Sequence, residues 1–253
     1  MELEDKVVVI TGAGRGIGAS AAGLMARNGA KVVIADIRED WGQETTDNIR
    51  ESDGVAEFVK TDVSEEGDVA DLIEYAVATH GRLDAIVNNA ATTVIGKANE
   101  ITAEDWDRVM RVNVAGVFYG CKHAIRQFLE QDGGSIVNMG SISAVVGLPE
   151  RAAYCASKGA VFQLSRQIAM EFASDNIRCN TVGPGSVEGD FLRNNLARAS
   201  DPEAAEERIL GAHPIGRLAD PLEIAEVVMF LVSDRSSFVT GANLQADGGY
   251  TAI

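Results

Sequence analysis

The sequence predicts an α/β fold in which a parallel sheet of about seven strands carries helices on both faces. Short β-branched runs alternate with helical patterns along the whole chain, as expected of repeated strand–helix units. No Pro/Ser-rich linker, repeat or low-complexity tract interrupts the 253 residues, and this length suits one large sheet. We therefore expect residues 1–253 to form a single, doubly wound domain.

The first strand and the turn after it predict a dinucleotide site. Residues 7–10 are β-branched throughout, which is typical of a strand buried on both faces, and residues 19–27 predict a helix. Between them, glycines spaced Gly-x-x-x-Gly-x-Gly let backbone N–H groups approach a pyrophosphate, whose charge the helix dipole favours. This spacing differs from the common Gly-x-Gly-x-x-Gly pattern. We expect a Rossmann-like fold whose cofactor contacts here are Gly12, Arg15, Gly16, Ile17 and Gly18.

A second strand, 31–35, ends at an acidic residue that predicts the choice of cofactor. Asp36 can accept hydrogen bonds from the adenosine ribose hydroxyls, and it repels a 2′-phosphate. Asp36 and the adjacent Ile37 are therefore expected at the adenosine, and NAD is favoured over NADP. Arg15 and Arg38 could each meet a phosphate or pair with acidic neighbours. The structural alternative for Asp36 is a turn or helix cap.

Five further strands are expected at 56–61, 83–87, 135–141, 177–182 and 242–246. The third exits at Asp62-Val63, and a helix follows, with Ser64 its expected N-cap and Asp62 the alternative. Small and amide residues follow the fourth strand at 88–91, and Ser141 ends the fifth. A long helix is expected at 103–131 and contains Asn113, which could also be an ordinary packing or solvent-facing amide.

Tyr154 and Lys158 are the best candidates for proton transfer. They lie four residues apart in a helix expected at 152–172, so both project from one face. A free phenol has a pKa of about 10, and a nearby cation lowers it. Lowering it to about 7 takes roughly 4 kcal/mol. One lysine would not supply that, so we expect a second cation, such as an oxidised nicotinamide ring.

Together these motifs resemble the short-chain dehydrogenase/reductase family over nearly the whole chain. The motifs are 11–18, Asp62-Val63, Asn88-Asn89-Ala90-Ala91, Asn113, Ser141, Tyr154 with Lys158, and Pro184-Gly185. The resemblance implies hydride transfer between NAD(H) and a secondary alcohol or ketone. It places Asp62 and Val63 at the adenine, Asn89 and Ala90 in the cofactor site, and Pro184, Gly185 and Val187 at the nicotinamide.

The same resemblance implies four catalytic residues: Asn113, Ser141, Tyr154 and Lys158. Tyr154 is the expected general acid/base, Lys158 lowers its pKa, Ser141 orients the substrate, and Asn113 holds a water that links Lys158 to solvent. Two positions depart from the family pattern. Ala91 replaces a glycine, and Gly189 replaces a threonine that contacts the cofactor in the family, so the loop after the sixth strand should be more pliable.

Residues 186–220 are expected to form an irregular, mobile lid over the active site. Phe191, Leu192 and Leu196, with Val145, Val146 and Leu148, suggest a pocket for a small, largely apolar, possibly cyclic compound. Arg151 and Arg193 could each meet one carboxylate. Small residues on the 152–172 helix and the edge strand 242–246 fit the homotetramers common in the family, or internal packing.

Composition narrows the partners further. A net charge of −16 disfavours nucleic acid and anionic membranes. Cys121, Cys155 and Cys179 suit reduced thiols, and no signal peptide or membrane span is recognisable, so we expect a cytoplasmic protein. The three histidines lack ligand-like spacing, so no metal is expected; each is interpreted as a surface or packing residue.

Two other functions remain open at this stage. One is a 3-oxoacyl-thioester reductase, which usually uses NADPH; Asp36 argues against it. The other is a non-catalytic, nucleotide-sensing regulator of the same fold, which would not need Ser141, Tyr154 and Lys158 together. Enoyl reductases of related fold place the tyrosine and the lysine farther apart than four residues.

Overall fold

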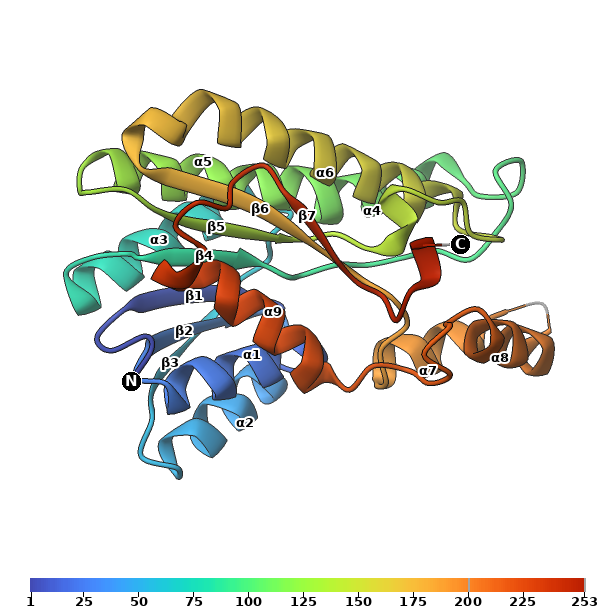
Figure 1. The fold of residues 1–253 in the computed structure, drawn as a ribbon, viewed down its shortest axis with the longest axis horizontal. Helices are drawn as coiled ribbons and strands as arrows, with labels where there is room; N and C mark the ends of the chain where they lie inside the picture. Colours follow the sequence, from blue (N-terminus) through green and yellow to red (C-terminus); the bar gives the residue numbers. More distant parts are fainter. Residues whose placement is uncertain (200, 253) are drawn as a thin grey trace.

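A computed structural model describes residues 1–199 and 201–252 and contains a seven-stranded, entirely parallel sheet (Figure 1). The strand order is β3-β2-β1-β4-β5-β6-β7. The strands are β1 (Val7–Thr11), β2 (Lys31–Asp36), β3 (Val55–Lys60), β4 (Ala85–Asn88), β5 (Gly134–Met139), β6 (Ile177–Pro184) and β7 (Asn243–Ala246). All seven expected strands are present, and the fold class is confirmed.

Helices cover both faces of the sheet. They are α1 (Gly16–Arg27), α2 (Glu39–Arg50), α3 (Glu66–His80), α4 (Ala103–Met110), α5 (Gly116–Leu129), α6 (Ala152–Phe172), α7 (Asp190–Leu196), α8 (Pro202–Gly211) and α9 (Pro221–Val232). In Figure 1, α1, α2 and α9 lie on one side, and α3, α5 and α6 lie on the other. Short 3₁₀ turns complete the described elements at Ile142–Ala144, Ala173–Asp175, Asp234–Ser236 and Tyr250–Ala252.

The β-branched run of β1 supplies both hydrophobic cores. Val8 and Ile10 pack in one cluster with residues of α1 and α9, whereas Val7 and Val9 pack in the other with α3, α5 and α6. Side chains of a strand alternate between faces, so a strand covered on both sides must be apolar throughout. This is why the sequence of β1 shows no polar alternation.

The chain order reverses between β1 and β4, and this positions the site. β1 pairs with β2 on one side and with β4 on the other, so the loops after β1 and β4 diverge to opposite faces. In open α/β sheets, ligands bind in the crevice outside the carboxyl ends of such strands. The glycine turn follows β1 here, and the Asn89-Ala90 segment follows β4.

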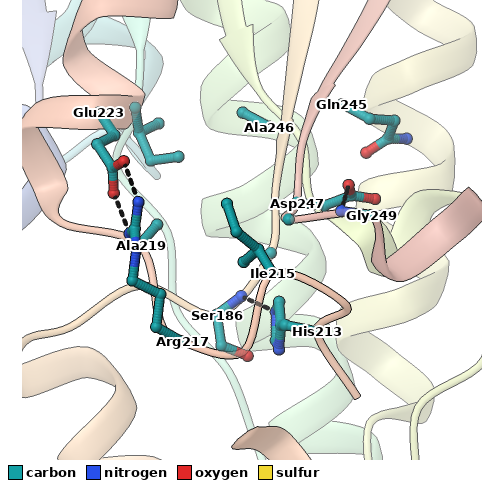
Figure 2. Close-up of a pocket in the computed structure, with 13 residues that line it drawn as sticks. Ser186, His213, Ile215, Arg217, Ala219, Glu223, Gln245, Ala246, Asp247 and Gly249 are labelled. Atoms are coloured by element: carbon teal, nitrogen blue, oxygen red, sulfur yellow. Dashed lines mark hydrogen bonds and ion pairs between the residues drawn. The ribbon is translucent and has the colours of Figure 1, made fainter. Parts of the chain in front are cut away.

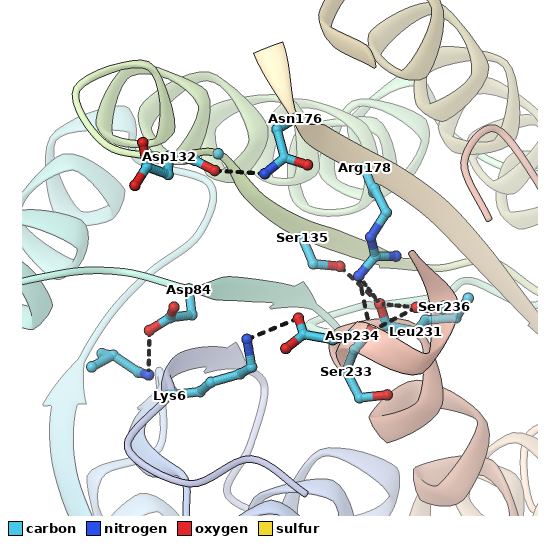
Figure 3. A network of polar contacts seen from close by, with 12 residues as sticks. Lys6, Asp84, Asp132, Ser135, Asn176, Arg178, Leu231, Ser233, Asp234 and Ser236 are labelled. Carbon is cyan, nitrogen blue, oxygen red and sulfur yellow. Dashed lines mark hydrogen bonds and ion pairs between the residues drawn. The ribbon is translucent and has the colours of Figure 1, made fainter. Parts of the chain in front are cut away.

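The opposite, amino end of the sheet is held by a polar network (Figure 3). Arg178, near the start of β6, donates from Nη2 to the carbonyls of Leu231 and Ser233 at 2.9 and 3.2 Å. The Ser135 hydroxyl donates to the Leu231 carbonyl at 2.9 Å. These donors satisfy carbonyls that the end of α9 leaves without helical partners, and they tie α9 to β5 and β6.

Three expectations of local structure are wrong. The 103–131 helix is divided into α4 and α5 by a π-helical turn, Arg111–Ala115, which contains Asn113. Ser64 does not cap α3; its N–H and hydroxyl donate to Asp62 at 2.9 and 2.7 Å, and α3 begins after Glu65 without a side-chain cap. The 186–220 region is not irregular, because it contains α7 and α8.

Two further findings bear on earlier expectations. The three cysteines are free thiols, with Cys121 and Cys179 buried. Among residues 1–199 and 201–252, no helix has the length and apolar character needed to cross a membrane.

Candidate active site

A cavity of about 1080 Å³ runs along the carboxyl end of the sheet, from the glycine turn to the lid. It is lined by most residues that the sequence singled out for the cofactor and the chemistry: Gly12, Arg15, Gly16, Ile17, Asp36, Ile37, Asp62, Val63, Asn89, Ala90, Ser141, Tyr154, Lys158, Pro184, Gly185 and Val187. Two of the predicted residues lie outside its wall. Gly18 is buried within the first turns of α1, and Asn113 lies in the π-helical turn.

The glycine turn is shaped to leave room for a ligand. Gly12 and Gly16 have φ values of +61° and +59°, which favour glycine, and a Cβ at Gly16 would meet no atom within 4 Å. A Cβ at Gly12 would lie 2.7 Å from the Cα of Ala90. The turn therefore packs against β4 on its inner side and stays open on its outer side, at the N-terminus of α1, where an anion is favoured.

Asn89 and Thr11 hold this turn in place. Asn89 donates from Nδ2 to the carbonyls of Thr11 and Gly12 at 2.9 and 2.8 Å. The Thr11 hydroxyl accepts from the N–H groups of Asn89 and Ala90 at 3.0 and 3.1 Å. Ala91, which departs from the family glycine, is not among the described residues with positive φ, so this alanine is accommodated.

Asp36 lines the cavity at the carboxyl end of β2, and the nearby arginines have carboxylate partners. Its carboxylate accepts from the backbone N–H groups of Gly14 and Arg38, both at 2.9 Å. Arg15 pairs with Glu44 at 2.9 Å, and Arg38 pairs with Asp40 at 3.0 Å. Neither guanidinium is therefore a free partner for a 2′-phosphate.

The adenine side of the cavity combines Ile37, Asp62 and Val63. Ile37 is 56% exposed, so an apolar side chain stands in the cavity without a partner. One carboxylate oxygen of Asp62 accepts both bonds from Ser64. A Cβ at Gly116 would lie 2.9 Å from the Val63 carbonyl, so glycine lets α5 approach this segment closely.

Ser141, Tyr154 and Lys158 meet on one wall of the cavity. Lys158 is 2% exposed, its Nζ donates to the Met139 carbonyl at 2.6 Å, and this Nζ lies 5.6 Å from the centroid of the Tyr154 ring. Ser141 is 8% exposed and accepts from the Ser143 N–H at 3.1 Å. α6, one turn of which carries Tyr154 and Lys158, begins and ends where the sequence predicts.

In the protein alone, burial sets the direction in which the pKa values of Tyr154 and Lys158 shift. Burial raises the pKa of Tyr154 to about 12, although the Ser141 hydroxyl and the Arg151 charge act in the opposite direction. Burial also lowers the pKa of Lys158 to about 8. The phenol pKa thus moves opposite to the expected direction, because a half-buried ring loses more from desolvation than the available cations restore.

Asn113 anchors the exit of β4 to α6. It is fully buried, its Oδ1 accepts from the Thr92 N–H at 2.8 Å, and its Nδ2 donates to the Thr92 carbonyl at 2.9 Å and to the Ser157 hydroxyl at 3.0 Å. Ser157 immediately precedes Lys158. The π-helical turn places the amide for these bonds, as such turns often do at functional sites.

The loop after β6 forms the other wall. Gly185 donates to the Ala246 carbonyl at 3.1 Å, and Val187 forms an isolated bridge with Ala219. Gly189 has a φ of +140°, and a Cβ there would meet no atom within 4 Å. Glycine replaces the family threonine at a position where the backbone itself disfavours a side chain.

Sequence reasoning missed the role of His213. It is only 4% exposed, and its Nε2 accepts from the Ser186 N–H at 3.0 Å (Figure 2). Its Nδ1 bonds the Ile209 carbonyl at 2.7 Å. Because a carbonyl only accepts, we assign the ring proton to Nδ1. His213 therefore links the loop after β6 to the end of α8, and it is not a surface residue.

Helix α7 brings apolar side chains to the wall that carries Tyr154. The Phe191 ring of α7 lies 6.3 Å from the Tyr154 ring, centroid to centroid. Leu148, Leu192 and Leu196 also line the cavity, as expected, whereas Val145 and Val146 do not. Within the described part of the chain, no group of three or more His, Cys, Asp or Glu side chains is arranged to hold a metal ion.

The geometry agrees with comparisons to known proteins. A family model described as enoyl-(acyl carrier protein) reductase matches residues 12–251. The cyclopentanol dehydrogenase of Comamonas sp. is 39% identical over 250 residues, covering 99% of this chain and 98% of that protein. The trans-4-hydroxycyclohexanecarboxylate dehydrogenase of Sinomonas cyclohexanicum is 39% identical over 254 residues, covering 98% and 93%.

A solved structure agrees equally well. The levodione reductase structure superposes with a TM-score of 0.96 at 30% identity, and the match covers 99% of each chain. The family match, the full-length relatives and the shared topology lead to one conclusion: the chain belongs to the short-chain dehydrogenase/reductase family.

Proposed function

We propose that this protein is an NAD-dependent dehydrogenase that interconverts a secondary alcohol and its ketone on a small, largely apolar, ring-shaped compound. One observation carries the proposal: Ser141, Tyr154 and Lys158 share a cavity with the glycine turn and Asp36. Relatives named for cyclopentanol and for a hydroxycyclohexanecarboxylate support a ring alcohol, since both names specify a secondary hydroxyl on a ring.

The residues present fit a dinucleotide. The cavity is long enough to reach from Asp36 to Tyr154, and the open side of the turn offers backbone N–H groups at a helix N-terminus. Gly12, Arg15, Gly16, Ile17 and Gly18 would hold or shape the pyrophosphate site. The other expected cofactor contacts are Asp36, Ile37, Asp62, Val63, Asn89, Ala90, Pro184, Gly185 and Val187, with Tyr154 and Lys158 at the nicotinamide end.

The preference for NAD follows from charge. Asp36 places a carboxylate where a 2′-phosphate would lie, and Arg15 and Arg38 are already paired with Glu44 and Asp40. A 3-oxoacyl-thioester reductase of the usual kind would need a cation at this point. The measurement that separates the two is the ratio of kcat/KM for NADH and NADPH; a strong NADPH preference would overturn the proposal.

Tyr154 performs the proton transfer in this mechanism. In oxidation, the substrate hydroxyl gives its proton to the Tyr154 oxygen while the Ser141 hydroxyl hydrogen-bonds the same substrate oxygen and keeps it in line. When bound, NAD⁺ would supply the hydride acceptor for oxidation and NADH the hydride donor for reduction. Lys158 favours the phenolate by its charge, and Asn113 orders the segment that precedes it.

Turnover of Tyr154→Phe tests the chemistry. The variant should lose oxidation of cyclopentanol and of 4-hydroxycyclohexanecarboxylate while it retains NADH binding, followed by nicotinamide fluorescence. Normal turnover would refute the assignment of Tyr154. If the wild type binds NADH but turns over no alcohol or ketone in a broad screen, the hypothesis of a nucleotide-sensing regulator replaces that of a dehydrogenase.

We also propose that the protein assembles as a homotetramer with a lid at residues 186–220. The sheet ends at β7, and Phe238, near this edge, is completely exposed. Met170 on α6 is 69% exposed, so apolar surface is available on both elements. Sedimentation velocity of the wild type and of Phe238→Ser tests the assembly; a monomeric wild type would refute it.

A further inference from the structure

Arg151 stands out in the cavity because its charge has no ionic partner among residues 1–199 and 201–252. Its Nη1 is buried and makes no hydrogen bond to any described residue, and its side chain forms no ion pair among them. The other arginines near the cofactor region, Arg15 and Arg38, each have a carboxylate partner. A buried N–H donor without a partner costs free energy, so the unbonded Nη1 of this half-buried side chain requires an explanation.

The position of Arg151 suggests what the missing partner is. It lies at the N-cap of α6, three residues before Tyr154, and both side chains line the same cavity. Their charges interact, since the Arg151 cation acts on the titration of Tyr154 and burial lowers the pKa of Arg151. Nη1 itself is enclosed by protein, whereas the half-buried side chain as a whole lines the cavity in which the substrate must lie.

Resting on the proposed function, we infer that the substrate carries a carboxylate or a similar oxyanion, and that Arg151 binds it while Tyr154 handles the hydroxyl. A guanidinium matches a carboxylate through paired N–H donors, and these charge-assisted bonds are strong where water is excluded. Such a ligand would give the Arg151 charge the ionic partner that the described residues do not supply.

Competing charges in the cavity do not provide this partner. Glu150, adjacent in sequence, lies near enough to act on the Arg151 charge but forms no ion pair with it. Glu188 and Asp190 also line the cavity, but both are exposed and thus hydrated. Arg193 and Arg208 are the rival cations: both line the cavity too, yet they are exposed on α7 and α8, where water can satisfy their donors.

The inference is tested with two ligands of equal shape and different charge. The substrates are 4-hydroxycyclohexanecarboxylate and its primary carboxamide, and the quantity is the ratio of their kcat/KM values with NAD⁺. We expect the wild type to favour the acid, and Arg151→Met to lower this ratio at least tenfold. Arg193→Met, the matched control, should leave the ratio close to that of the wild type.

Binding without turnover separates this inference from the proposed function. Calorimetry in the presence of NADH measures cyclohexanecarboxylate and cyclohexanecarboxamide, which lack the reactive hydroxyl. We expect the wild type and Arg151→Lys to bind the acid more tightly than the amide, and Arg151→Met to lose this preference. This result supports the inference even if no alcohol is oxidised. The acid/amide comparison in the wild type needs no variant, so it remains decisive if a variant fails to fold.

Three outcomes would overturn the inference. The wild type could bind acid and amide equally. The preference could depend on Arg193 and not on Arg151. Arg151→Met could lower kcat/KM for both substrates by the same factor and displace the pH profile of turnover, which would show that Arg151 acts on Tyr154 and not on the substrate.

Discussion

The ammonium of Lys158 is bound to the Met139 carbonyl at 2.6 Å and does not reach the phenol oxygen of Tyr154 by any described hydrogen bond. Lys158 is thus a cation buried against a single neutral acceptor. Burial lowers its pKa to about 8, from 10.5 in the unfolded chain. Below about pH 8, the buried charge of Lys158 therefore lowers the free energy of unfolding. Above 10.5, where the amine is neutral in both states, this effect is gone.

This effect predicts a pH dependence of stability. Between these two pH values the unfolded chain binds more protons, so the free energy of unfolding rises with pH, by on the order of 3 kcal/mol from this group. In urea denaturation, Lys158→Met should have a larger free energy of unfolding than the wild type at about pH 7.5. This difference should shrink as the pH rises to about 10. Lys97→Met, at an exposed site, should show no such trend.

Tyr154 should remain protonated in the free protein well into the alkaline range. Burial raises its pKa to about 12. The difference between the absorbance spectra of the wild type and of Tyr154→Phe should therefore show no phenolate band below about pH 10. Saturating NAD⁺ should bring the phenolate signal to lower pH, because it adds a positive charge. A titration that NAD⁺ does not move would mean that the cofactor is not the second cation.

Removing the charge of Asp36 should relax the choice of cofactor. Asp36→Asn keeps an oxygen for the Gly14 N–H, removes the charge that repels a 2′-phosphate, and loses the second oxygen, which accepts from the Arg38 N–H. We expect the ratio of kcat/KM for NADP⁺ to that for NAD⁺ to rise at least tenfold. The control is Asp71→Asn, an exposed carboxylate of α3 outside the cavity, which should leave the ratio in place.

His213 should matter for the cofactor loop more than a packing residue would. His213→Phe leaves the Ser186 N–H and the Ile209 carbonyl without their partner, which should cost about 2 kcal/mol of unfolding free energy. Because Ser186 follows the Pro184-Gly185 segment, KM for NAD⁺ should rise more than kcat falls. If KM is unaffected while stability drops, His213 only supports the fold.

Gly189 and Gly147 form a matched pair for backbone strain. A Cβ at either position would meet no atom within 4 Å, but only Gly189 has a positive φ, at +140°. Gly189→Ala should therefore destabilise the lid by roughly 1–3 kcal/mol, seen as faster proteolysis within 186–220. Gly147→Ala should be neutral or slightly stabilising; equal effects at the two sites would show that the φ value is not the cause.

Much of the fold could be predicted because local patterns and tertiary structure agree. α6 has exactly the expected range, since its apolar spacing, small residues and lack of proline all favour a helix. The first strand was recognisable because burial on both faces leaves a continuous β-branched run, from Val7 to Ile10. The acid at the end of β2 and the glycines after β1 also occupy the expected places in the cavity.

The incorrect predictions concern features that depend on contacts between residues far apart in the sequence. The π-helical turn has the same apolar pattern as an ordinary helix, and it is fixed by the bonds of Asn113 to Thr92 and Ser157. His213 acquires its role only when Ser186 folds against it. The lid helices did leave a signal that was missed: an aspartate precedes Pro202 as an N-cap, and this combination commonly begins a helix.

The network around Arg178 has a practical consequence for protein engineering. It secures α9 at the end of the sheet farthest from the cavity through bonds that do not involve the α7–α8 segment. A segment exchange that is meant to change substrate preference can therefore spare this anchor. Exchanging residues 190–208 keeps Ile209, His213 and the Val187–Ala219 bridge, and should redirect selectivity without unfolding the protein.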